Sequence, residues 1–83
     1  MKKNMLKKDL DYYMNLPWTY TLSTELDRKG KKFFVVHVNE LPGVATDAPT
    51  IAEAMELIKE PMSLIIEWYL EDGVEIPEPT VLS

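Results

Sequence analysis

Cysteine is absent from this chain, and histidine and glycine are scarce. Without cysteine there is neither a disulfide framework nor a thiol nucleophile, which fits a reducing compartment, so we expect a cytoplasmic protein. The three glycines form no phosphate-binding loop. The single histidine, His37, completes no Ser/His/Asp arrangement, and a metal site needs several converging ligands. The sequence therefore predicts no catalytic residue, no cofactor and no metal.

A long apolar segment is also missing. The apolar run Leu64-Ile65-Ile66 ends at Glu67, far short of the roughly 20 residues that cross a bilayer. Lysines cluster near the N-terminus, but no uninterrupted apolar segment follows them. We therefore expect neither a secretory signal nor a membrane partner.

Positive charge is missing from the second half of the chain. Residues 1–39 hold eight lysines and arginines against four acids, whereas residues 40–83 hold one lysine against ten acids. The acidic half would repel nucleic acid and attract a basic surface. A solvated acidic face explains the same pattern without any partner.

The N-terminal residues show helical spacing. Leu6, Leu10, Tyr13 and Met14 predict a short amphipathic helix over residues 5–15. The helix should end before Pro17, because the residue preceding a proline is pushed out of the helical region. We expect residues 1–16 to form a loosely attached helical extension of a core that spans residues 17–83, all in one domain.

Two strands joined by a polar turn are predicted next. Residues 18–26 alternate apolar with polar side chains, which places Trp18, Tyr20, Leu22 and Leu26 on one face of a half-buried strand. Residues 27–30 form the turn, and residues 33–39 form the second strand. That strand has Phe34, Val36 and Val38 on one face and Phe33, Val35 and His37 on the other. Apolar residues on both faces predict a central strand, or one whose second face meets another chain.

A short strand over residues 44–46 and a helix from Thr50 complete the core. Thr50 and Glu53 form a capping box, in which each side chain would bond a free backbone N–H. Pro61 should kink or split the helix, and Gly73 is a plausible C-cap. The predicted apolar stripe of the helix contains Ile51, Met55, Ile58, Met62, Ile65 and Tyr69, widened by Ala54 and Leu57. Residues 80–82 would add a short edge strand. The predicted class is α+β, with a three-stranded antiparallel sheet, a short edge strand and one long helix in the order β-β-β-α-β, preceded by a short helix.

Several short segments resemble one family when their order and spacing are taken together. They are Tyr12 to Thr19, Val38-Asn39-Glu40-Leu41-Pro42-Gly43, Thr50 with Glu53 and Ala54, Leu70 to Gly73 and Ile76 to Pro79. Over residues 12–79 this pattern resembles the HicB-like antitoxins, which have a partial, degenerate RNase H-like fold. The resemblance implies a β-β-β-α-β domain that binds HicA, a small basic RNA-cleaving toxin, and blocks its active surface.

The chain departs from the family pattern in three places. Ala48-Pro49 replaces a common Gly-Asp, Pro61 interrupts a helix that is usually continuous, and no basic segment follows Lys59. Many members carry a C-terminal DNA-binding module, and its lack here leads us to expect no DNA-binding domain and no direct nucleic-acid partner.

The expected partner-binding surface combines the acidic helix face with apolar anchors. A small domain buries a modest share of its surface, and one hairpin and one helix cannot cover both faces of a sheet. The predicted partners are a small basic HicA-like toxin and a second copy of the chain. The predicted contact residues are Phe33, Val35, Glu53, Glu56, Glu60, Glu67 and Trp68.

Three alternatives stay open. A residual metal-dependent nuclease of RNase H ancestry would need Asp27, Glu40 or Asp47 to converge on a divalent ion. An orphan oligomeric domain would have no toxin at all. Direct nucleic-acid binding would use the N-terminal lysines and the basic turn at residues 28–32.

Overall fold

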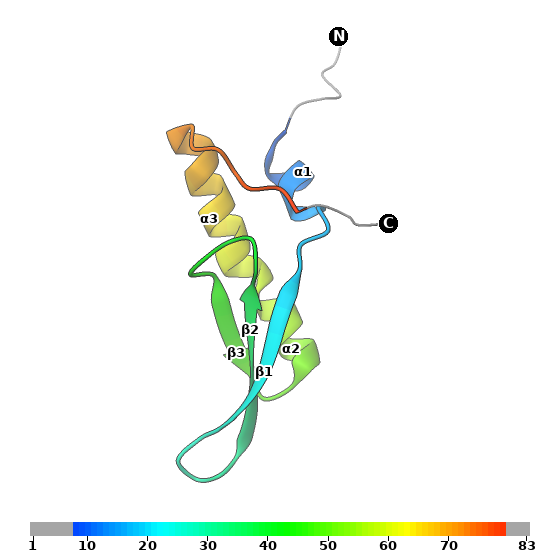
Figure 1. The fold of residues 1–83 in the computed structure, drawn as a ribbon, viewed down its shortest axis with the longest axis vertical. Coiled ribbons are helices and arrows are strands. Elements are labelled where there is room, and N and C mark those ends of the chain that lie inside the picture. Colours follow the sequence, from blue (N-terminus) through cyan, green and yellow to red (C-terminus); the bar gives the residue numbers. More distant parts are fainter. Residues whose placement is uncertain (1–7, 80–83) are drawn as a thin grey trace.

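The structure is a computed structural model that describes residues 8–79. It has an α+β fold, as predicted (Figure 1). The elements in chain order are α1 (Leu10–Met14), β1 (Tyr20–Leu26), β2 (Lys32–Val38), β3 (Ala45–Ala48), α2 (Ile51–Leu57) and α3 (Lys59–Asp72). The strand predicted at residues 80–82 and the first residues of the predicted N-terminal helix lie outside the described residues.

The three strands form one antiparallel sheet in the order β1-β2-β3, so β2 is central, as its two apolar faces predicted. Val36 of β2 lies opposite Leu22 on one side and Thr46 on the other. The turn between β1 and β2 is built by Asp27, whose carboxylate accepts hydrogen bonds of 2.8 Å from the N–H groups of Lys29 and Lys31. Gly30 has the positive φ that this turn requires.

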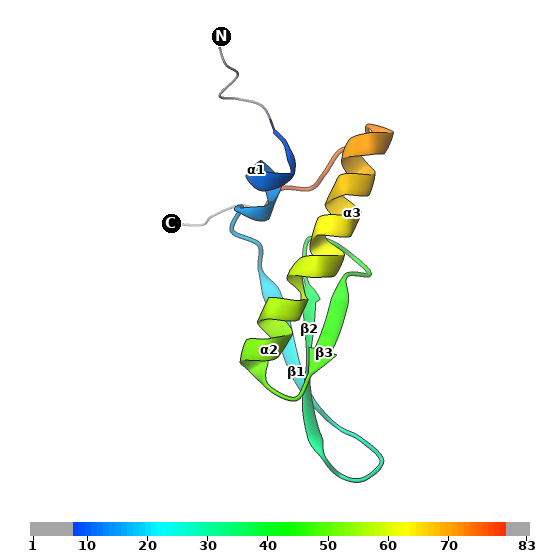
Figure 2. The same cartoon turned by 180° about the vertical axis from the view of Figure 1, so that it is seen from behind.

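Helices α2 and α3 cover only one face of the sheet. Val36 and Val38 are buried beneath them, and α2 packs against β2 and β3 (Figure 2). Because side chains alternate along a strand, Phe33, Val35 and His37 lie on the opposite face. Leu22 and Leu26 share the helix-bearing face with Val36 but are exposed, since they belong to the edge strand β1.

The predicted long helix is split, and Pro61 accounts for the position of the break. Helix α2 ends at Leu57 and α3 begins at Lys59. Proline has no N–H to donate to the carbonyl of Leu57, four residues earlier. The bonds on either side persist, from Ile58 to Ala54 at 3.0 Å and from Met62 to Ile58 at 3.2 Å. The two helices therefore continue in roughly one direction.

Both predicted ends of the helical region are present. The Thr50 hydroxyl accepts a bond from the Glu53 N–H at 3.1 Å and donates one of 3.0 Å to the Glu53 carboxylate. The glutamate thus engages the threonine side chain, whereas the predicted box had it bonding a backbone N–H. Gly73 ends α3 in the left-handed conformation, with φ of 69°.

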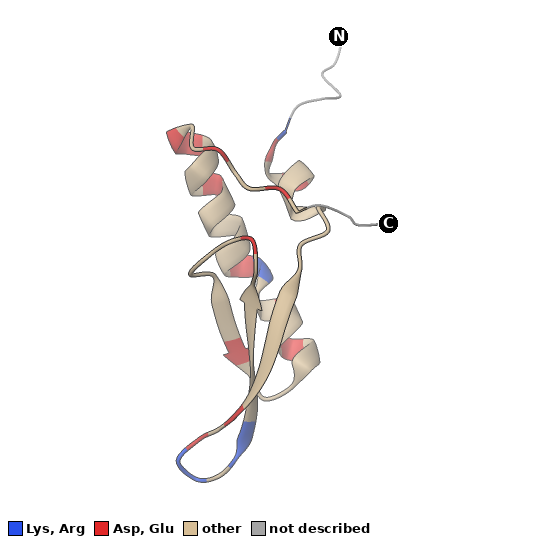
Figure 3. Ribbon diagram, viewed as in Figure 1, with Lys and Arg blue, Asp and Glu red and all other residues tan. Residues whose placement is uncertain are grey.

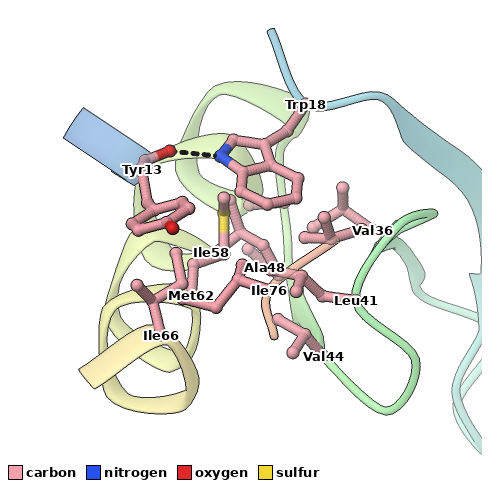
Figure 4. Packing of buried hydrophobic residues seen from close by; sticks show 12 residues of the cluster. Tyr13, Trp18, Val36, Leu41, Val44, Ala48, Ile58, Met62, Ile66 and Ile76 are labelled. Atoms are coloured by element: carbon pink, nitrogen blue, oxygen red, sulfur yellow. Dashed lines mark hydrogen bonds between the residues drawn. The ribbon is translucent and has the colours of Figure 1, made fainter. Parts of the chain in front are cut away.

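The buried stripe of the helices has a different phase from the predicted one. Ala54, Ile58, Met62 and Ile66 are fully buried, so every fourth residue faces the core. Figure 4 shows Ile58, Met62 and Ile66 among the packed core side chains. Ala54, Ile58 and Met62 were predicted correctly, but Ile51 and Leu57 are exposed and Met55, Ile65 and Tyr69 are only partly buried. Ala54 is completely buried where α2 packs against the sheet, whereas Leu57 lies on the outer side of α2 and Ile51 is exposed as its first residue.

Candidate functional site

The outer side of α2 and α3 carries a row of glutamates. Glu53, Glu60 and Glu67 recur every seven residues, which places them on one line along the side opposite the buried stripe. All three are exposed. Figure 3 shows acidic residues along both helices and basic residues at the hairpin turn, where acidic residues also lie. The hairpin turn thus holds charges of both signs, whereas α2 and α3 carry many acids and a single base, Lys59.

Glu56 lies next to this row but is engaged by a base. Its carboxylate forms an exposed ion pair of 3.5 Å with Lys59, one helical turn away. Such an exposed pair contributes little to stability. It does lower the net negative charge at this point, so Glu56 is the least available of the four predicted acids.

An exposed apolar stripe runs beside the glutamate row. Leu57, Leu64 and Trp68 are 48%, 62% and 60% exposed, and their spacing of seven and four residues places them on one side of the helices. Trp68 was predicted as a contact residue, whereas Leu57 and Leu64 were not. The predicted core-facing stripe included Leu57, so the exposed apolar stripe was not predicted.

The predicted sheet anchors lie elsewhere. Phe33 and Val35 are half-buried on the face of the sheet that the helices leave open, together with the exposed His37. They therefore do not form one continuous surface with the acidic helix residues, in contrast to the prediction. The alternation of the strand revealed two apolar faces, but it did not indicate which of them the helices cover.

Phe33 approaches the helical side only at the hairpin end of the sheet. It lines a cleft of about 400 Å³ together with Pro49 and Leu57, and with the charged residues Asp27, Lys31, Lys32 and Asp47. This cleft is the place where a sheet anchor and a residue of the exposed helix stripe share one surface.

The acids considered for a nuclease have local structural partners. Asp27 holds the hairpin turn, as described above. The Glu40 carboxylate accepts bonds from the N–H and the hydroxyl of Thr19, joining the loop after β2 to the chain before β1. Partial burial raises the pKa of Glu40, but the bonds from Thr19 outweigh it and leave this pKa below its ordinary value. Within residues 8–79, no group of three or more His, Asp or Glu side chains is arranged to hold a metal ion.

A cluster that sequence reasoning missed ties the end of the described chain to α1. Glu78 forms an ion pair of 3.0 Å with Lys8 and accepts a bond of 3.0 Å from the Tyr12 hydroxyl. The bond from Lys8 lowers the pKa of Glu78, and the bond to Glu78 raises the pKa of both Lys8 and Tyr12. No local signal could reveal this contact, because 70 residues separate Lys8 from Glu78.

A cleft of about 850 Å³ lies beside this cluster. Its walls are the end of α3 with Tyr69, the segment after Gly73 with Val74 and Glu75, and the cluster residues Lys8 and Glu78. Lys8 and Glu78 are already paired to each other, and Glu75 is the one further charged residue of the walls, so the acidic helix surface remains the stronger candidate for binding a partner.

Comparison with models of protein families, with curated proteins and with solved structures finds no match to this chain. None of the described helices has the length and apolar character that a membrane span requires.

Proposed function

We propose that this chain is an antitoxin-type interaction protein, resembling the HicB-like family, that binds a small basic RNA-cleaving toxin and neutralises it by covering its active surface. The observation that carries the proposal is the outer side of α2 and α3. There the row Glu53, Glu60 and Glu67 runs beside the exposed stripe Leu57, Leu64 and Trp68. We call these six residues the outer helix surface.

The composition of the outer helix surface favours a protein partner. Exposed apolar residues gathered on one side mark interaction sites, and tryptophan is enriched among the residues that dominate binding energy. A solvated face would need only the glutamates. Leu64 and Trp68 are among the most exposed large apolar side chains of the described residues, and burial in an interface would remove them from water.

The charge of the outer helix surface favours a basic partner. Lys59 is the only base in residues 40–83, and it is paired with Glu56. Acidic rows steer basic proteins toward them and repel acidic ones. A second copy docked through this same surface would bring its own glutamates near, so a basic protein suits it better.

The arrangement of the chain also supports the proposal. Three antiparallel strands followed by a helical region is the order that the resemblance implies. The Leu41-Pro42-Gly43 segment, which carries part of the resemblance, forms a tight turn in which Leu41 is buried and Gly43 has φ of 88°.

The test begins with co-purification of the tagged full chain from its native cells, followed by mass spectrometry. The proposal expects a small basic protein in stoichiometric amount. That protein, once purified, should cleave RNA alone and lose the activity when this chain is added. Recovery of the chain only with itself, or a partner whose RNA cleavage it does not block, would contradict the proposal.

Variants then locate the contact surface. Glu60→Lys combined with Glu67→Lys should weaken toxin binding at least about tenfold, because each reverses a charge that faces the basic partner. Trp68→Ala should weaken binding by a similar factor of about ten through lost apolar contact. Glu75→Lys and Leu70→Ala are the matched controls, because both residues are exposed but lie off the outer helix surface. Binding should also weaken as salt rises, and equal effects of test and control variants would place the interface elsewhere.

A further inference from the structure

Among residues 8–79, strand β1 has a free edge. Two backbone hydrogen bonds fix which residues of β1 bond to β2. One runs from the Asn39 N–H to the Thr19 carbonyl, and the other from the Asp27 N–H to the Lys31 carbonyl. The residues of β1 that bond to β2 are the odd-numbered ones, so the N–H and C=O groups of Leu22, Thr24 and Leu26 point away from the sheet. No loop or turn within residues 8–79 offers them a backbone hydrogen bond.

This edge lacks the features that usually prevent strand pairing. Strand β1 is seven residues long, contains no proline and has one charged residue, Glu25. The charge lies on the open face of the sheet, opposite Phe33. Leu22 and Leu26 are 44% and 66% exposed. A long, exposed and apolar edge of this kind is a template for another strand.

The other edge of the sheet is protected. Strand β3 has only four residues, carries Asp47 and ends before Pro49. Short strands, charges and prolines are the usual means of blocking an edge. The two edges therefore differ, and within the described part of the chain only β1 is available along its whole length.

The sequence of β1 is complementary to itself in antiparallel pairing. With a twofold axis at Thr24, Leu22 of one copy lies opposite Leu26 of the other, and the pairs of even-numbered residues use the free N–H and C=O groups. The four leucines then lie on the helix-bearing face, beside the half-buried Phe34 of each copy. On the open face Ser23 lies opposite Glu25, so no like charges are opposed.

We propose that β1 pairs antiparallel with β1 of a second copy around Thr24, so that the two three-stranded sheets become one continuous sheet. This interface is separate from the outer helix surface, which stays free in the dimer for a basic toxin. It needs neither a toxin nor the family resemblance. A test of the dimer can therefore fail or succeed independently of the proposed function.

Sedimentation of the full chain over a range of concentrations tests the pairing. The mass should reach twice the 9.6 kDa of one chain. Leu22→Glu and Leu26→Lys should each shift the chain to monomer, because each places a charge against a leucine. The double variant should regain the dimer, because the introduced carboxylate and ammonium then lie opposite each other. Leu64→Glu, on the exposed helix stripe, is the control and should stay dimeric. Circular dichroism verifies that each variant is folded.

Amide hydrogen exchange gives a second readout of the same interface. The amides of Leu22, Thr24 and Leu26 should be protected in the wild-type dimer and exchange fast in the two single variants. The amides of Thr21, Ser23 and Glu25 bond to β2 and should stay protected in both. Rising salt should leave the dimer intact or strengthen it, since both copies are acidic, whereas it should weaken toxin binding.

Four results would overturn the proposal. They are a wild-type chain that stays monomeric, single variants that stay dimeric, a double variant that stays monomeric, and a monomer whose Leu22, Thr24 and Leu26 amides become protected only when the toxin is added. The last result would assign the edge to a strand of the toxin.

Discussion

The indole N–H of Trp18 donates a hydrogen bond of 2.7 Å to the backbone carbonyl of Tyr13, and both side chains are buried (Figure 4). Tyr13 belongs to α1, and Trp18 lies just before β1. The bond therefore fixes the segment that joins the first helix to the sheet. Helix α1 also packs against α3. The predicted boundary at residue 16 does not separate a loose extension from a core, because Tyr13 is part of the core.

Trp18→Phe should destabilise the fold by about 2 kcal/mol, because it removes a buried hydrogen bond and leaves space where the indole packed. Urea denaturation followed by circular dichroism measures the loss. Trp68→Phe makes the same chemical change at an exposed site and should cost less than about 0.5 kcal/mol. Equal losses in the two variants would show that Trp18 does not hold α1 against the sheet.

Ala54→Leu should destabilise the fold by about 1–3 kcal/mol, because a larger side chain cannot fit where α2 meets the sheet. Ala54 is completely buried, whereas Ala52 on the same helix is exposed. Ala52→Leu is therefore the control and should be nearly neutral. Thermal melting of both variants separates the two outcomes, and a neutral Ala54→Leu would mean that the helix stands further from the sheet.

Local signals in the sequence predicted most of the fold. The two apolar faces of residues 33–38 identified a central strand, Asp27 and Gly30 identified the turn, and Pro61 identified the break in the helix. Each feature depends on residues close together in the chain. Short-range sterics and hydrogen bonding therefore decide it, whatever the rest of the molecule does.

The candidate site was predicted only in part, because its geometry depends on how elements pack. Alternation in β2 could not show that the helices cover Val36 and Val38, so it could not show that Val35 lies on the open face and that Phe33 meets the helix stripe only at the cleft with Leu57. The predicted apolar stripe of the helix placed Leu57 in the core. The stripe that packs on the sheet runs through Ala54, and Leu57 is exposed. The free edge of β1 also follows only from the strand order.

Asp27→Ala should destabilise the fold by about 1 kcal/mol, because two backbone N–H groups of the hairpin turn lose their acceptor. Asp27→Asn keeps a side-chain oxygen in place and should retain most of the stability. Urea denaturation with and without Mg²⁺ checks both variants. If Asp27 instead binds a metal for a nuclease reaction, Mg²⁺ should stabilise the wild type and Asp27→Asn should abolish that gain.

The cluster of Lys8, Tyr12 and Glu78 should make stability depend on pH at both extremes. The pKa of Glu78 lies below its ordinary 4.5, so its contribution is complete above pH 4.5 and is lost as the pH falls through the folded-state value. The pKa values of Tyr12 and Lys8 lie above their ordinary 10.0 and 10.5, so their contributions are complete below pH 10.0 and are lost as the pH rises through the folded-state values.

Glu78→Gln isolates that contribution. Its melting temperature should lie below that of the wild type between pH 4.5 and pH 10.0, and the difference should shrink outside this window. Because all three groups are exposed to solvent, the difference should be small and should decrease in high salt. Glu75→Gln, which removes a nearby exposed carboxylate, is the control and should follow the wild type at every pH. A Glu78→Gln curve that runs parallel to the wild type through acid and alkali would show that the cluster does not form in solution.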